Sequence, residues 1–78
     1  MSYDFIAHAK RIENALILAG SEDIAKRLED VRLGGATSGE ILMGLRHECQ
    51  LAQSERRIPQ EIKTDMLALA HEVNETGI

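Results

Sequence analysis

Residues 59–73 read PQEIKTDMLALAHEV and decide the fold. Apolar residues recur in this stretch every three or four positions, which is the spacing of one face of an α-helix. They are Ile62, Met66, Leu69 and Val73. Pro59 suits a first helical position, because the N–H that proline lacks would have no partner there. Gly77 is a typical stop signal. We therefore expect a helix over 59–75 that buries one face.

Three earlier segments show the same periodicity, and glycines end the first two of them. We expect these helices over 3–19, 22–33 and 38–56, with Gly20 and Gly34 as stop signals. No segment has the strict alternation of a β-strand. Helices joined by short connections pack roughly antiparallel. The sequence predicts an all-α fold, a compact antiparallel four-helix domain formed by the single unit 1–78.

Capping residues support these starts. Ser2 can cap the first helix and Ser21 the second. Thr37 and Glu40 have the spacing of a capping box, in which the threonine oxygen accepts from the backbone N–H three residues later. All three expected starts therefore have a hydroxyl residue in place to satisfy an unpaired N–H.

The helix expected over 38–56 contains three small residues with different roles. Gly39 and Gly44 each weaken the helix by about 1 kcal/mol relative to alanine, or else allow a neighbouring helix to approach closely. Cys49 falls on the apolar side, where a free cysteine acts as a small buried hydrophobe. It is the only cysteine, so this chain forms no internal disulfide.

The charge balance limits the classes of partner. Thirteen Asp and Glu against nine Lys and Arg give a net charge of −4. We do not expect nucleic-acid or anionic-lipid binding, since both depend on Lys and Arg displacing counterions. No apolar run approaches the ~20 residues that cross a bilayer, so we expect no membrane association. The first residues lack the features of a secretion signal, which makes the cytosol the expected compartment.

Four carboxylates of the last helix are the main candidate binding site. They are Glu61, Asp65, Glu72 and Glu75, and helical geometry places them on one side, away from the apolar face. Glu61 and Asp65 repel each other at i,i+4, a cost that a basic partner would remove. The alternative interpretation is an ordinary solvated face.

The acidic residues of the second helix are interleaved with basic ones. Glu22–Lys26 and Asp23–Arg27 both have the favourable i,i+4 order. We interpret this cluster as self-neutralised and structural. On the first helix, Ile6 and Ile17 lie off the main apolar face and form a possible dimer contact or an ordinary extension of the core.

Catalytic and metal-binding motifs are missing from the sequence. It contains no nucleophile elbow, phosphate-binding loop or His-Glu-x-x-His spacing. A four-helix domain of this size has little room for a substrate pocket of about several hundred Å³. We expect no enzymatic activity, no metal and no cofactor.

In size, charge and helical content the chain resembles the four-helix immunity proteins of nuclease colicins. That resemblance implies a small acidic protein that neutralises a basic partner. Those proteins carry a tyrosine-containing segment after their acidic helix, whereas the only tyrosine here is Tyr3, so no residue role is transferred.

The leading hypothesis is an acidic protein-binding module, in its most concrete form an immunity- or antitoxin-type inhibitor of a basic protein such as a toxin. Met43 or Leu51 would supply an apolar anchor beside the charges. Two alternatives remain: a DNA-binding regulator that uses the second and third helices as a helix-turn-helix, and a homodimeric structural domain. The loop between those two helices is expected to be longer than the usual turn of about 3–4 residues in that motif.

Overall fold

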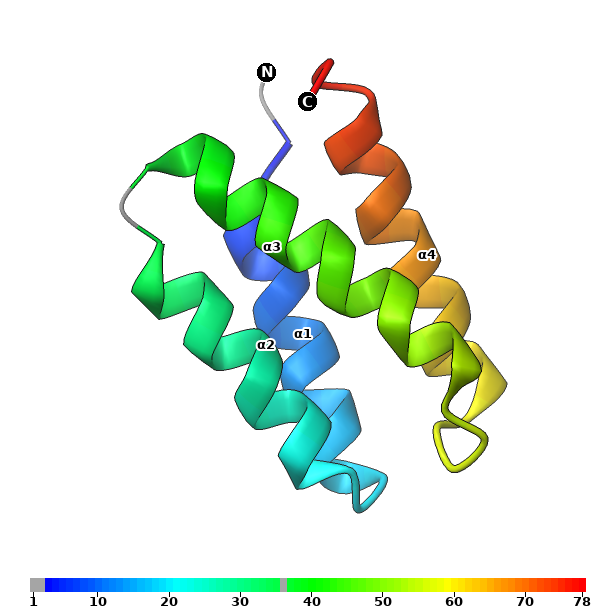
Figure 1. Ribbon diagram of the computed structural model, residues 1–78. Helices are drawn as coiled ribbons and strands as arrows, with labels where there is room; N and C mark the ends of the chain where they lie inside the picture. Colours follow the sequence, from blue (N-terminus) through cyan, green and yellow to red (C-terminus); the bar gives the residue numbers. More distant parts are fainter. Residues whose placement is uncertain (1–2, 36) are drawn as a thin grey trace.

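Four α-helices make up the described part of the chain, residues 3–35 and 37–78 of a computed structural model. They are α1 (Phe5–Leu18), α2 (Glu22–Gly34), α3 (Ser38–Leu51) and α4 (Gln60–Asn74), with a short 3-10 helix (Ala52–Ser54) after α3. Figure 1 shows two antiparallel hairpins, α1–α2 and α3–α4, with the chain termini at the same end. The predicted all-α four-helix domain is confirmed.

The helix ends follow local hydrogen bonding. Asp4 is the N-cap of α1 and accepts from the backbone N–H of Ala7 at 2.9 Å, while Ser2 lies outside the described residues. The predicted cap of α3 is confirmed, because Thr37 Oγ1 accepts from the backbone N–H of Glu40 at 3.2 Å. Ser21 holds the N-cap position of α2 without a side-chain capping bond.

The third helix is shorter than predicted. Regular α-helix stops at Leu51, and the chain tightens into the 3-10 turn before Glu55 adopts an extended backbone. The segment 38–56 therefore divides into a helix, a tight turn and a loop. Ile58 follows this loop and is buried, which fastens the connection to the core.

The core is aliphatic and continuous across all four helices. Its largest fully buried side chains include Ile12, Leu16, Leu28, Leu45, Met66, Leu69 and Val73. Burying each of these stabilises the fold by about 1.5–3 kcal/mol before conformational entropy is subtracted. Cys49 is buried among them, as predicted, and this burial raises the pKa of its thiol to about 12. No helix of residues 3–35 or 37–78 has both the length and the apolar character to cross a membrane.

Helix α3 packs antiparallel along α2. Val31 faces Gly44, where a Cβ atom would lie 2.5 Å from Val31 Cγ1, so the missing side chain allows a close approach. One turn before Val31 on α2 and one turn after Gly44 on α3, Arg27 Nε lies 3.0 Å from Glu48 Oε1. Helix α2 ends at Gly34 and α3 begins at Ser38, so the connection is shorter than expected. The two contacts, one turn apart on each helix, place α2 alongside α3, whereas the helices of a helix-turn-helix cross at roughly 90–120°.

Candidate functional site

The acidic strip, comprising Glu61, Asp65, Glu72 and Glu75, lies along the flank of α4 that faces α1. Contact between Asp65 and His8 of α1 fixes this orientation, because Nε2 of His8 is 2.7 Å from Oδ1 of Asp65. Helical rise places Glu61 and Glu72 about 16 Å apart along the axis. The strip is therefore long enough to meet several basic side chains of a partner.

Asp65 is only partly available to a partner. His8 is 2% exposed, and its ring bonds on both sides: Nε2–H donates to Asp65, and Nδ1 accepts from the hydroxyl of Tyr3. The carboxylate accepts only, which assigns the proton to Nε2. The Asp65 side chain remains 43% exposed, so water still reaches part of it.

The other three carboxylates differ in their partners. Glu75 lies 3.1 Å from His71, one turn earlier on α4, and both side chains are exposed. Glu61 and Glu72 form no ion pair within residues 3–35 and 37–78. Arg11 follows His8 by one turn on α1, and no ion pair joins it to the strip in the same ranges. Two of the four predicted carboxylates thus have a histidine partner, and two have none.

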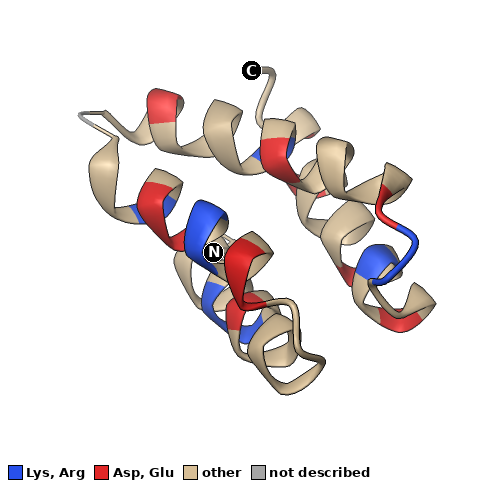
Figure 2. Ribbon diagram, turned by 60° about the horizontal axis from the view of Figure 1, so that its bottom comes forward, with Lys and Arg blue, Asp and Glu red and all other residues tan. Residues whose placement is uncertain are grey.

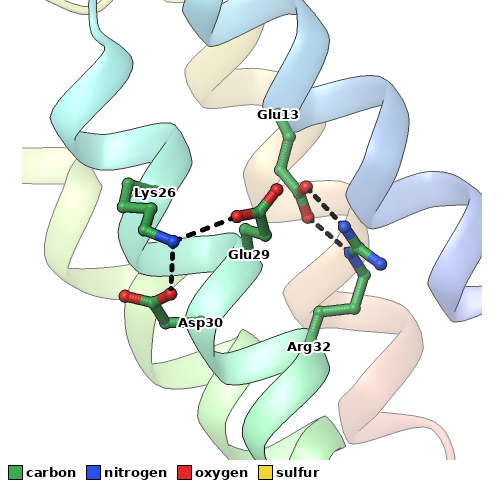
Figure 3. A network of polar contacts seen from close by, with 5 residues as sticks. All are labelled: Glu13, Lys26, Glu29, Asp30 and Arg32. Atoms are coloured by element: carbon green, nitrogen blue, oxygen red, sulfur yellow. Dashed lines mark hydrogen bonds and ion pairs between the residues drawn. The ribbon is translucent and has the colours of Figure 1, made fainter.

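A buried ion pair joins the opposite flank of α1 to α2 (Figure 3). The guanidinium of Arg32 donates two hydrogen bonds to Glu13, at 2.9 and 3.0 Å. Both side chains are largely buried, and the Glu13 carboxylate raises the pKa of Arg32. The two parallel hydrogen bonds of this bidentate pair offset the free-energy cost of removing both charges from water.

Within the described residues, the remaining charges of α2 are also paired, except that of Glu22, although not by the predicted i,i+4 pairs. Lys26 contacts Asp30 and Glu29, which raise its pKa. Arg27 pairs instead with Glu48 of α3. Asp23 pairs with Arg57 of the loop before α4. Basic and acidic residues consequently alternate over the α1–α2 side of the molecule (Figure 2).

The two predicted apolar anchors are exposed, and no described contact joins either of them to the acidic strip. Met43 is 52% exposed on α3. Leu51 is also exposed and lines a shallow depression with Ile24 and Arg27, on the α2 side of α3. The strip lies on the α1 side of α4. The structure therefore does not bring Leu51 together with the carboxylates, and no described contact joins Met43 to them.

An open hollow of about 620 Å³, the α1–α3 hollow, lies where α1 and α3 begin. It is lined by Tyr3, Asp4, Phe5, Ile6, Ser38, Ile41 and Leu42. It is an open surface depression and not an enclosed pocket. Among the described residues, no three His, Cys, Asp or Glu side chains are arranged to hold a metal ion. The Tyr3 hydroxyl and the Asp4 carboxylate already bond within the chain.

His8 and Glu13 were missed as structural residues by reasoning from the sequence. Both lie at the edges of the apolar face of α1, His8 on one side and Glu13 on the other. A polar residue at such an edge becomes buried when a neighbouring helix packs there, and it then needs a partner. A polar residue at each edge of the apolar face therefore indicates, from the sequence, that α1 contacts a different helix on each side.

Comparison of the chain with protein-family models, with curated proteins and with solved structures finds no match.

Proposed function

We propose that this protein is a small acidic protein-binding module whose acidic strip receives a basic protein partner. The observation that carries the proposal is that neither Glu61 nor Glu72 forms an ion pair in the described ranges, whereas three of the four acids of α2, all but Glu22, have basic partners. An immunity- or antitoxin-type inhibitor of a basic toxin is the most concrete form of this function.

The proposed mechanism is electrostatic attraction of the partner by carboxylates that α4 holds at fixed positions. Helix α4 is fixed by its buried face and by the contact between Asp65 and His8, so the carboxylates keep their spacing without a partner. Complementary charge accelerates encounter and sets orientation, whereas exposed charges add little affinity alone. An inhibitor of this kind would hence also need an apolar contact.

The two alternative functions have different support. A helix-turn-helix is disfavoured, because α2 runs back along α3 and three arginines, Arg27, Arg32 and Arg57, contact carboxylates of the same chain. A DNA-binding surface requires such side chains for phosphates. Homodimerisation stays a prediction that sedimentation equilibrium checks directly.

Charge reversal tests the proposed function with a lysine-rich peptide as the probe. We expect Glu61→Lys and Glu72→Lys each to slow association about tenfold at low salt, because each replaces attraction by repulsion. Stopped-flow fluorescence of a labelled peptide measures the rate. The effect should shrink as added salt screens the charges.

Glu22→Lys is the matched control. Glu22 and Glu61 are both exposed acids in the first turn of a helix, so the two variants change the net charge and the helix terminus equally. We expect Glu22→Lys to slow association much less. Equal slowing by all three variants would show that overall charge attracts the peptide, and that the strip has no special role.

A further inference from the structure

The α1–α3 hollow is an apolar surface with one acidic residue in its wall. Phe5, Ile6, Ile41 and Leu42 supply most of the lining, and Asp4 supplies the carboxylate. None of the residues that line it is basic. Pockets of about 300–1,000 Å³ accommodate large ligand groups, so the hollow has room for an apolar side chain of a partner.

Ile41, in the first turn of α3, forms one wall of the hollow and is held close to the end of α2. A Cβ atom on Gly35 would overlap Ile41 Cγ1, so glycine is required for Ile41 to pack against this end of α2. Phe5 and Ile41 are each only partly buried against the core. The two helix starts therefore leave apolar surface between them.

A hydrogen-bonded chain connects the hollow to the acidic strip. Tyr3 lines the hollow, and its hydroxyl bonds Nδ1 of His8. Nε2 of the same ring donates to Asp65 in the strip. One partner segment can accordingly contact both surfaces, since only a buried imidazole separates them.

We propose that the α1–α3 hollow receives a large apolar side chain of the same basic partner that meets the acidic strip. The inference rests on the proposed function and replaces Met43 and Leu51 as the anchor site. Charge complementarity selects the occupant: Asp4 attracts basic residues that flank the inserted side chain, and it repels acidic ones.

Three synthetic helical peptides test the hollow, each observed by the amide chemical shifts of the labelled protein. The first is lysine-rich and carries two leucines one turn apart. The second has serines in place of the leucines, and the third has glutamates in place of the lysines. We expect the first to perturb Ile6, Ile41 and the strip, and to bind about tenfold more tightly than the second. The second should perturb only the strip.

The outcomes separate the hollow from the strip. If the first peptide perturbs the strip alone and binds no better than the second, the hollow inference is overturned and the proposed function stands. If neither lysine-rich peptide perturbs the strip, both fail. If the glutamate-rich peptide occupies the hollow as tightly as the first, charge does not select the occupant and the inference is overturned.

Ile6→Lys and Ile17→Lys form a matched pair for the same titration. Both isoleucines are exposed on α1, at 38% and 48%, but only Ile6 lines the hollow. We expect Ile6→Lys to reduce the affinity for the leucine-containing peptide to that for the leucine-free one, and Ile17→Lys to leave it unchanged. Equal losses would overturn the proposal, and circular dichroism verifies that both variants fold.

Discussion

Helices α2 and α4 are each the second helix of a hairpin, yet their charged side chains differ in how many partners they have within the chain. Helix α2 is joined by ion pairs to α1, through Glu13 and Arg32, and to α3, through Arg27 and Glu48. Among the described residues, one polar side-chain contact, between Asp65 and His8, joins α4 to α1. Arg46 of α3 donates a hydrogen bond to the Asn74 side chain of α4 at 2.8 Å. Asn74 is uncharged, so this contact is not an ion pair.

This difference distinguishes carboxylates that form ion pairs within the fold from carboxylates that do not. A carboxylate inside a bidentate pair is already neutralised by its own chain, and a partner gains little by approaching it. Glu61 is exposed and Glu72 is half-buried, and neither carboxylate forms an ion pair within the described ranges. Acidic residues are abundant on both helices, so position and not composition decides which carboxylates are paired within the described ranges.

The largest expected effect comes from breaking the buried pair between α1 and α2. Glu13→Gln leaves the Arg32 guanidinium largely buried without its counter-ion, and we expect a loss of about 3 kcal/mol in the free energy of unfolding. Urea denaturation followed by circular dichroism measures it. A loss below that of an exposed variant such as Glu22→Gln would contradict the structural role of this pair.

A smaller loss is expected from the corresponding contact of α4. Asp65→Ala removes the acceptor for the buried Nε2–H of His8, and we expect a cost of about 1.5 kcal/mol. Asp65 is partly exposed, so water replaces some of the lost bond. Glu61→Ala is the control on the same strip and should leave the denaturation midpoint nearly unchanged. Equal effects would show that the contact with His8 contributes nothing.

Gly44 sharpens the comparison, since it is a position at which α3 lies close to α2. Gly44→Ala gains about 1 kcal/mol of helix propensity, but its Cβ overlaps Val31, which costs about 1–3 kcal/mol. We expect a net loss of about 1 kcal/mol in thermal or urea denaturation. Gly39→Ala, in the same helix with only a 4.0 Å contact to Thr37 Oγ1, should be neutral or stabilising.

The smallest effect concerns the exposed pair at the start of α2. A hydrogen bond from Arg57 lowers the pKa of Asp23 below its ordinary value of 3.8. The pair therefore stabilises the fold above pH 3.8, and this stability is lost as the pH falls through the lowered pKa. Denaturation midpoints of the wild type and Asp23→Asn should differ slightly at neutral pH and converge in acid. A difference that persists in acid would contradict this assignment.

The fold was largely predictable, because its signals are local. Apolar residues at helical spacing define the buried faces, and the cap at Thr37 follows from a hydroxyl placed three residues before Glu40. The early end of α3 at Leu51 was not predictable in this way. The apolar spacing continues through Ala52, whose backbone is instead tightened by the turn that leads to the buried Ile58.

The sequence by itself determined the number of helices, their buried faces and the acidic balance, since each of these depends on residues within a few positions of one another. Only the tertiary structure decided which charge meets which. Arg27 has an acid four residues before it, yet it contacts Glu48 across the bundle, because packing brings that carboxylate within reach. The same packing buried His8 against Asp65, left Glu61 and Glu72 without an ion pair in the described ranges, and opened the hollow between two helix starts far apart in the chain.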